Sequence, residues 1–347
     1  MDRQFGGDVD WSKRVPSFWN RMPRVPYKAN AKARRHIPKQ RRRLTNWPAY
    51  EASLRERGSL TVWFTDETIA AWRAEPRTSR GGQPWYSPLA ILTALTLRAV
   101  FRLALRQTEG LIGSIIRLLD LDLPVPDHTT LSRRAEMLDV PRPRSRANTE
   151  PVHLLVDSTG LKLCGAGEWL VEKHGTKTRR SWRKLHIGMD ADTGEVVAAA
   201  LTPNDMDDAS QVGPLLEQLH RPVASFTGDG AYDQDNVYRV VTERDPAAAV
   251  VVPPRSTAVP RATAATDPTQ RDRHLQNIAE NGRIGWQKIS GYNRRSRIET
   301  AIGRYKHVIG DGLRSRKDRR RATEVAVAVH ILNRMLELGR PNSVRIA

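Results

Sequence analysis

Cysteine is almost absent from the 347-residue sequence, which contains only Cys164. A single thiol cannot form an internal disulfide, so a reducing compartment is expected. No spacing of cysteine and histidine suggests a zinc site. The chain also lacks an apolar segment near its start and any uninterrupted apolar run of about 18 residues, which argues against a signal peptide and a membrane span. These absences predict a soluble cytoplasmic protein without a membrane partner.

Acidic residues are few relative to basic ones. Lys and Arg number 57 against 38 Asp and Glu, which gives a net charge of +19. Residues 1–47 hold 13 basic and 3 acidic side chains, and residues 294–321 hold 11 and 3. Such concentration indicates a polyanionic partner, with nucleic acid as the first candidate. An anionic membrane surface is less suitable because these segments lack a long apolar face. The remaining alternative is basicity that serves solubility or ribosome binding alone.

The patterns divide the chain into four parts. Residues 1–46 are rich in Pro and Arg without a persistent period, and they predict a disordered basic arm that binds phosphate backbones. Residues 47–145 predict a helical domain. Residues 146–338 predict an α/β catalytic domain with a small insertion at about 254–290, and residues 339–347 form a tail.

Helix start signals recur in the helical part. Ser87-Pro88 begins a strongly apolar stretch that extends to Leu105, a second helix follows from about Thr108, and a third begins near Asp127 after a proline-rich break. A helix, a short break and an Arg-bearing helix are similar to a helix-turn-helix, whose second helix enters the major groove.

The third predicted helix carries the candidates for DNA contact in this part, namely Thr130, Arg133 and Arg134. Helical hairpins are common, so the alternative is that these side chains form an ordinary solvated helix face.

From residue 151 onward, short apolar runs alternate with helical patterns. One run ends on Asp157, two strands flank a turn at Asp192-Thr193-Gly194, and a further strand ends near Asp229. The order strand, two hairpin strands, helix, strand, helix, strand and long helix predicts one mixed sheet.

The stretch from residue 291 to residue 306 predicts a helix with two distinct sides. At 100° per residue, a stripe about 60° wide contains Tyr292, Arg295, Glu299 and Lys306. The adjoining side is apolar and able to pack on a sheet; it contains Ile298, Ala301, Ile302, Tyr305 and Ile309. A surface helix with an ion pair would explain the presence of Arg295 and Glu299. It would not explain why Tyr292 and Lys306 lie on the same line.

Three carboxylates from separate elements are candidates for a catalytic site: Asp157, Asp229 and Glu299. Side chains at strand ends project into the crevice where α/β folds bind ligands. Three carboxylates can hold two divalent ions, and hard oxygen ligands select Mg²⁺ or Mn²⁺. Such a pair of ions can activate a water or a 3′-hydroxyl and stabilise the leaving oxygen of a phosphodiester. The alternative for each acid alone is a turn or capping role.

These residues carry a resemblance to a known family. One of its motifs is a Tyr, an Arg, a Glu and a Lys separated by two, three and six residues, matched without a gap by Tyr292, Arg295, Glu299 and Lys306. The stretches VDSTGLK around Asp157 and TGDGAYD around Asp229 resemble its two acidic motifs. In these features, together with PDHTTLSRR and SPLAILTALTLRAVF, the sequence resembles DDE (Asp-Asp-Glu) transposases of bacterial insertion sequences, in the insertion-sequence-five-like group.

The resemblance covers about residues 50–338 and implies a fold and a mechanism. The fold would be a ribonuclease-H-like (retroviral-integrase-like) α/β core with an N-terminal all-α, helix-turn-helix-like DNA-binding domain. The three acids would hold two Mg²⁺ ions, for which Mn²⁺ can substitute. Tyr292, Arg295 and Lys306 would bind phosphates near the scissile bond. The partners would be double-stranded DNA, at the element's terminal inverted repeats and at the target, and further copies of the chain, in a bacterial cytoplasm at the nucleoid.

Three further residues are weaker candidates. Lys184 and His186 follow Asp157 by one strand and could lie at the rim of the site, although ordinary strand alternation is the preferred interpretation. Trp286 could stack on a flipped base or pack in the core. Only 69 residues separate Asp229 from Glu299, so the long β-rich insertion of some family members is absent.

Two other functions remain possible from the sequence. A ribonuclease-H-like nuclease would cleave DNA without strand transfer. A repressor of its own element would bind DNA with a silent core, but an intact set of three acids argues against it.

Overall fold

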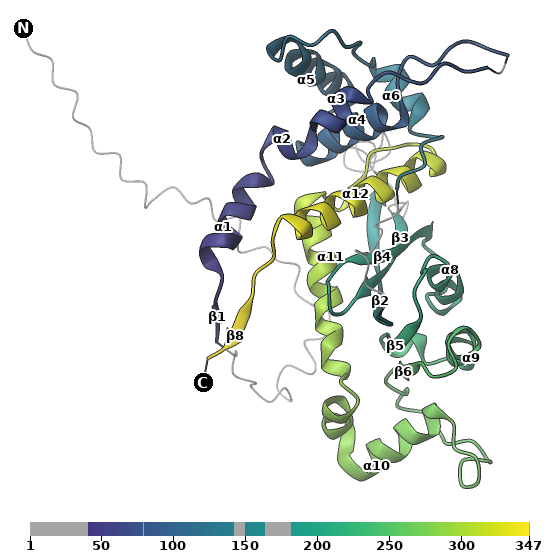
Figure 1. Ribbon diagram of the computed structural model, residues 1–347. Helices are drawn as coiled ribbons and strands as arrows, with labels where there is room; N and C mark the ends of the chain where they lie inside the picture. Colours follow the sequence, from purple (N-terminus) through teal and green to yellow (C-terminus); the bar gives the residue numbers. More distant parts are fainter. Residues whose placement is uncertain (1–40, 79, 142–149, 164–181, 347) are drawn as a thin grey trace, which may run out of the picture. The chain divides into compact units, whose positions relative to one another are not determined.

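The computed structural model describes residues 41–78, 80–141, 150–163 and 182–346 (Figure 1). Most of the predicted basic arm, the predicted linker after residue 141 and Cys164 lie outside these ranges. The chain divides into two compact units. One comprises Met1–Thr45 and Asn342–Ala347, and the other comprises Asn46–Pro341.

The smaller unit contains a pair of short strands. β1 (Arg42–Leu44) pairs antiparallel with β8 (Ser343–Arg345), and Arg43 lies opposite Val344. The prediction of a disordered arm to residue 46 is therefore wrong at residues 42–44, and the predicted tail contains β8. Three residues are too short to display a period of two, and the backbone partner of each strand is distant in the sequence.

The larger unit begins with helices, as the sequence predicted. They are α1 (Trp47–Glu56), α2 (Leu60–Trp63), α3 (Asp66–Ala70), α4 (Pro88–Val100), α5 (Leu105–Leu118) and α6 (His128–Arg134). The Ser87 hydroxyl accepts a hydrogen bond from the Ala90 amide, and Asp127 caps α6. The first long helix ends at Val100 rather than at Leu105, because Arg102 adopts a positive φ of 54° that an α-helix cannot accommodate.

Among the described residues, no single helix is long and apolar enough to span a membrane. The pair of α4 and α5 meets the criteria of length and composition when taken together, but the two helices are bent by 112° at their junction.

A mixed sheet follows the helices. Its strands are β2 (Val152–Leu163), β3 (Trp182–Asp190), β4 (Val196–Pro203), β5 (Val223–Thr227), β6 (Ala249–Val251) and β7 (Gly312–Leu313). The order is β4-β3-β2-β5-β6, and β7 pairs with the far end of β2. β3 and β4 run antiparallel to their neighbours, whereas β5, β6 and β7 pair in parallel. This arrangement confirms the predicted mixed sheet.

Strand β2 is longer than expected. The sequence placed Asp157 at a strand end, but pairing with β3 continues from Asp157, opposite Ile187, to Lys162, opposite Trp182. The strand end was misplaced because the residues from Ser158 to Gly160 are only half-buried and the apolar pattern stops before the backbone pairing does.

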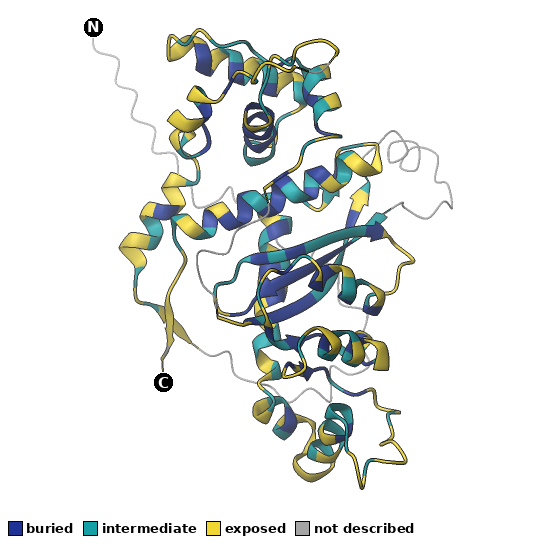
Figure 2. Ribbon diagram, turned by 45° about the vertical axis from the view of Figure 1, so that its right-hand side comes forward, coloured by how far each residue is buried: buried dark blue, intermediate teal, exposed yellow. Residues whose placement is uncertain are grey.

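Helices cover both faces of the sheet, so its strands are largely buried (Figure 2). One face packs against α8 (Val212–Leu216) and α9 (Asp235–Arg244), which share a core with Phe226 of β5. The other face packs against α11 (Ser296–Val308) and α12 (Asp318–Leu338). Along the chain, η4 (Ala209–Gln211) and η5 (Gly230–Tyr232) lie between β4 and α9. The helices α10 (Gln270–Ile289) and η6 (Tyr292–Arg295) lead into α11.

Helix α12 belongs to two hydrophobic cores. Val327, Ile331 and Met335 are buried with the helices α4 and α5, while Ala328 and Leu332 are buried against the sheet. These positions form two adjacent stripes at spacings of four residues on one helix. The helical part and the sheet consequently form a single compact unit, and no separation falls near residue 146.

The predicted insertion at about residues 254–290 is partly helical. Thr269 caps α10, whose 20 residues make up its second half. Gly282 interrupts α10 with φ 69° and ψ 167°, a conformation that favours glycine. The two parts of α10 therefore do not share one continuous helical period.

Candidate active site

The first candidate acid, Asp157, lies in the middle of β2. It is opposite Ile187, which is buried against α11 and α12, so its side chain lies on the face of the sheet that α11 covers. The Ser158 amide donates a hydrogen bond of 2.9 Å to Asp157 Oδ1. Burial raises the pKa of the Asp157 carboxyl, and the nearby guanidinium of Arg295 opposes this rise.

The second acid, Asp229, follows β5 by two residues. Because β5 runs parallel to β2, with Thr227 opposite Leu155, the end of β5 lies beside the middle of β2. Asp229 caps the short helix η5 by accepting a hydrogen bond of 2.9 Å from the Ala231 amide. Glycine is required at position 228, since a Cβ there would lie 2.7 Å from the ring of Tyr232. The Asp-Gly-Ala-Tyr turn therefore fixes Asp229 at the sheet edge.

The third acid, Glu299, projects from the first turn of α11. This helix packs on the sheet through Ile298, Ala301 and Tyr305, which are all buried, as the predicted apolar side required. The Glu299 side chain is 60% exposed, so it faces solvent at the edge of the site.

A 3₁₀-helix leads into α11. Gly291 has a φ of 71° and begins η6, in which residues three apart lie above one another. Tyr292 therefore lies on the same line as Arg295, and the α-helix continues that line to Glu299. The predicted stripe is retained, although its first residues follow a tighter helix than the sequence suggested.

Arg295 joins the three acids. Its Nη2 lies 2.9 Å from Asp157 Oδ2 and 3.7 Å from Asp229 Oδ2, and its Nη1 lies 2.6 Å from Glu299 Oε1. Its side chain is only 16% exposed. Burial alone would lower the pKa of Arg295, but Asp157 and the other nearby acidic groups raise it overall, so the guanidinium stays charged. Three acids distant in the sequence thus meet on one cation.

The donor set suits a divalent metal. It consists of carboxylate oxygens, which are the ligands that Mg²⁺ and Mn²⁺ prefer. In the structure, the positive charge among these oxygens is the guanidinium of Arg295. Within the described residues, no three Asp, Glu, His or Cys side chains are arranged as they stand to ligate an ion. The residue types therefore suit such an ion, whereas in the structure the three acids surround Arg295.

Trp286 lies beneath this site rather than on its surface. It is 1% exposed, its ring centroid is 5.3 Å from that of Tyr292, and its Nε1 donates to His274 Nδ1 at 3.0 Å. His274 Nε2 in turn donates to the Val250 carbonyl at 2.7 Å, which fixes the neutral tautomer of this ring. The suggestion that Trp286 stacks on a flipped base is therefore corrected: its ring is enclosed and supports Tyr292.

Lys184 and His186 lie on the opposite face of the sheet from Asp157. His186 is opposite Ser158 in the register, and residues alternate between faces. Lys184 forms an ion pair of 3.3 Å with Asp208, and the buried His186 hydrogen bonds to Thr202 at 2.8 Å. The suggestion of a role at the rim of the site is corrected accordingly, and strand alternation accounts for both residues.

The remaining candidates occupy α11 and α6. Lys306 is half-buried, and no carboxylate of the described chain lies within 4 Å of its ammonium. On α6, Thr130 donates its hydroxyl to Asp127 at 2.8 Å, so it has a capping role. Arg133 is exposed and Arg134 is half-buried.

The sequence did not identify two supporting residues. Asp233 accepts two hydrogen bonds from Arg271 of α10, at 2.7 and 3.0 Å. Tyr232 is buried, and its hydroxyl has no hydrogen-bond partner among the described residues. Both residues follow closely after Asp229 in the sequence. An aromatic residue and a second acid at these positions were the sequence features that could have identified them.

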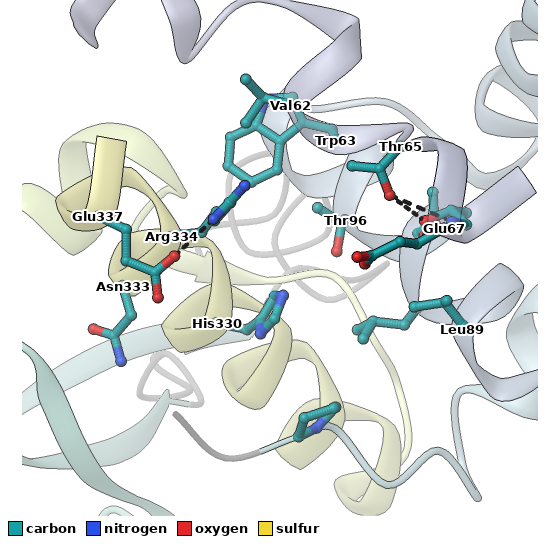
Figure 3. A pocket seen from close by; sticks show the side chains of 14 residues that line it. Val62, Trp63, Thr65, Glu67, Leu89, Thr96, His330, Asn333, Arg334 and Glu337 are labelled. Atoms are coloured by element: carbon teal, nitrogen blue, oxygen red, sulfur yellow. Dashed lines mark hydrogen bonds and ion pairs between the residues drawn. The ribbon is translucent and has the colours of Figure 1, made fainter. Parts of the chain in front are cut away.

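A cavity of about 660 Å³ lies elsewhere, between α2, α3 and α4 on one side and α12 on the other (Figure 3). Its polar lining includes Glu67, His330 and an ion pair of Arg334 with Glu337. None of the three acids lines it. The candidate site is instead open to solvent through Glu299, as a polymeric substrate requires.

A mixed sheet beside which three carboxylates gather is an arrangement typical of enzymes that act on phosphodiesters. Two family models, both described as a transposase DDE domain, match residues 55–166 and residues 148–335, and the second match alone spans over half of the chain. The chain therefore belongs to the DDE transposase family and is an enzyme of DNA cleavage and strand transfer. Enzymes of this family generally use divalent metal ions.

Solved structures of transposases are also similar. A piggyBac transposase synaptic complex with hairpin DNA shares 12% identity over 85% of this chain and 76% of that chain, with a TM-score of 0.41. A Drosophila P element transposase strand transfer complex shares 16% over 60% and 47%, with a TM-score of 0.30. A pre-cleavage Mos1 transpososome shares 11% over 76% and 82%, with a TM-score of 0.21. The assignment to the family rests on the sequence models alone.

Proposed function

We propose that this chain is the transposase of a bacterial insertion sequence of the insertion-sequence-five-like group, with Tyr292, Arg295, Glu299 and Lys306 as its signature. It would bind the terminal inverted repeats of its element, hydrolyse the DNA at the element ends with Mg²⁺, and join the freed 3′-hydroxyls to target DNA. It would act at the nucleoid. The convergence of Asp157, Asp229 and Glu299 on Arg295 carries this proposal.

The three acids have separate structural supports, which suits a site that must keep its geometry. Asp157 is held within a paired strand, Asp229 by its capping hydrogen bond, and Glu299 by the packing of α11. When bound, two Mg²⁺ ions would polarise the scissile phosphate and lower the pKa of an attacking water or hydroxyl. Without a cation, three neighbouring carboxylates repel one another, so the site needs Arg295 or metal at all times.

Arg295 would have two successive partners. In the structure Arg295 forms ion pairs with the acids. Once released from them, its guanidinium would be well suited to bind a phosphate of the substrate. Tyr292 lies one 3₁₀ turn before it and Lys306 two α-helical turns beyond Glu299. We propose that these three side chains hold the DNA backbone along the acids.

The similar structures suggest the form of the assembly. The piggyBac structure is named as a synaptic complex with hairpin DNA, and the P element structure as a strand transfer complex. We propose that this chain likewise acts as a dimer or larger oligomer on double-stranded DNA, since two element ends must be brought together.

The test is cleavage of DNA that flanks the gene on both sides. A plasmid carrying both flanks around a marker is incubated with the protein and Mg²⁺, and the nicked or released fragments are separated by electrophoresis. We expect cleavage at the flank ends by the wild-type protein and none by Asp229→Ala. Full activity of Asp229→Ala would contradict the mechanism.

The same reaction separates the two alternatives. Adding a second plasmid and sequencing joined products distinguishes a transposase from a nuclease, which would leave cleaved ends unjoined. Specific binding of the flanks without any metal-dependent cleavage would instead indicate a repressor.

A further inference from the structure

The described residues of the loop between α3 and α4, 71–78 and 80–87, form an arm. The Ala74 amide donates to the Trp85 carbonyl at 3.2 Å, and Arg73 and Tyr86 form an antiparallel bridge. Farther out, the Gln83 side chain makes two hydrogen bonds, of 2.7 and 2.9 Å, with the backbone of Arg77. The loop is therefore held as a hairpin-like arm, and Figure 1 shows it projecting past α6.

The base of this arm is fastened to the connection that leads into α6. Trp72 donates its indole N–H to the Pro124 carbonyl at 2.8 Å, and Tyr86 donates its hydroxyl to the Val125 carbonyl at 2.9 Å. Arg73 donates to the Asp122 carbonyl at 2.7 Å. Three side chains of the arm thus bind three carbonyls just before Asp127, so the arm and α6 form parts of one surface.

The outer part of the arm is basic and exposed. Arg77 and Arg80 are exposed, and neither forms an ion pair with a carboxylate of the described chain. Nearer the base of the arm, Trp85 is 68% exposed, which is unusual for so large an apolar side chain. The only acid within the arm is Glu75.

The same charge sign continues onto α6. Arg133 and Arg134 also lack carboxylate partners among the described residues. Partial burial lowers the pKa of Arg134, and the like charges of Arg77 and Arg133 lower it further. Arg77 therefore lies close enough to α6 for mutual repulsion, which a bound anion would relieve.

We propose that the arm, through Arg77 and Arg80, binds the phosphate backbone of double-stranded DNA next to the groove that α6 would enter. This inference rests on the proposed function, because it extends the DNA surface predicted for α6 to the arm. A duplex suits these arginines better than a single phosphate does. Its regularly spaced phosphates can pair with arginines of both the arm and α6. Trp85, at the base of the arm, lies against the sugar-phosphate chain and loses its exposure.

Fluorescence anisotropy with a short labelled duplex from the DNA flanking the gene tests the arm. Ca²⁺ replaces Mg²⁺ to prevent cleavage, and binding is titrated at several salt concentrations. We expect the double variant R77A/R80A to bind about tenfold more weakly and to lower the salt slope by about 2, one per lost phosphate contact. The variant R77K/R80K keeps both charges and should retain most of the slope.

Arg239→Ala is the matched control. Arg239 is an exposed arginine on α9, which covers the sheet face opposite α11 and α12. Its loss removes one positive charge without touching the arm, so the affinity and the slope should stay at the wild-type values. Unchanged binding by R77A/R80A beside a wild-type protein that binds would overturn this inference alone. A wild-type protein that binds no duplex would overturn the proposed function as well.

Discussion

The guanidinium of Arg295 donates a hydrogen bond of 2.9 Å to the carboxylate of Asp157, a residue 138 positions earlier in the chain. The same guanidinium lies within ion-pair distance of Asp229 and Glu299. This single cation therefore offsets one of the three negative charges that the acids bring together. A divalent ion that binds these acids through the same oxygens would displace this guanidinium, so Arg295 and the metal would compete for them.

The first prediction concerns that competition. Replacing Arg295 by Gln leaves the largely buried Asp157 without a counterion, so the metal-free protein should lose about 2–4 kcal/mol of unfolding free energy. Ca²⁺ should raise the Tm of Arg295→Gln more than that of the wild type, because no guanidinium has to be displaced. Thermal unfolding with and without Ca²⁺ measures both effects.

Arg239→Gln provides the comparison for this experiment, since Arg239 forms an exposed ion pair with Glu243. It should behave like the wild type in both buffers. An equal response of Arg295→Gln and the wild type to Ca²⁺ would show that the guanidinium does not compete with metal.

The second prediction separates the metal ligand from the ion pair at Glu299. Its side chain is 60% exposed, and exposed ion pairs contribute about 0–1 kcal/mol. Glu299→Gln should therefore change the unfolding free energy by less than about 1 kcal/mol. Cleavage should fall more than the roughly 10–100-fold typical of residues that only support a ligand. Stability measured in denaturant and cleavage of flank DNA provide the two readouts. Lower stability with intact cleavage would make the pair with Arg295 the whole role of Glu299.

The third prediction concerns pH. Burial tends to raise the pKa of Asp233, but the hydrogen bonds from Arg271 and from the Arg255 amide outweigh it and hold the pKa below its usual value. An acid whose folded pKa is depressed stabilises the fold above its unfolded pKa of about 3.9, and this contribution is lost as the pH falls through the folded pKa. Wild-type stability should therefore drop on acidification below about pH 4.

Asp233→Asn tests this assignment by urea unfolding at a series of pH values. The variant should be less stable at pH 7 by about 3–5 kcal/mol, because the charge of Arg271 loses its buried partner. Its stability should also decline less steeply in acid. Asp235→Asn, which removes a largely exposed acid from the same region, should keep the wild-type slope. Parallel curves for Asp233→Asn and the wild type would assign the acid sensitivity to other carboxyls.

The fourth prediction concerns Trp286. Substitution by Phe removes its hydrogen bond to His274 and leaves a small void under Tyr292, so the unfolding free energy should fall by about 1–3 kcal/mol. DNA binding measured well below the Tm should be unchanged, because the ring is enclosed. Trp47→Phe, at an exposed position on α1, should alter neither property. A specific loss of DNA affinity in Trp286→Phe would restore the idea that this ring stacks on a base.

Local features were predicted well from the sequence. Ser87 and Asp127 were both predicted to begin helices, and each accepts the expected hydrogen bond from a backbone amide. A cap acts within three residues, so a short stretch contains all the information that it needs. The apolar side of α11 was likewise visible, because one helix period contains it.

Features that depend on distant partners were not predicted. β2 continues past Asp157 because β3 supplies hydrogen bonds there, and nothing in the residues around Asp157 reveals this. The contacts of Arg295 with three acids depend on the strand order of the sheet and on the packing of α11 against it. The position of Trp286 depends on α10, whose second half follows the break at Gly282.

The two stripes of α12 have a consequence for synthesis of the chain. Residues from Val327 to Met335 complete the core of the helical part, yet nearly the entire sheet precedes them in the sequence. A growing chain therefore exposes the unfinished apolar surfaces of α4 and α5 until this late segment has left the ribosome. The helices that carry the proposed DNA surface acquire their final packing only after the strands bearing Asp157 and Asp229 have been made, so binding and catalytic parts should mature together.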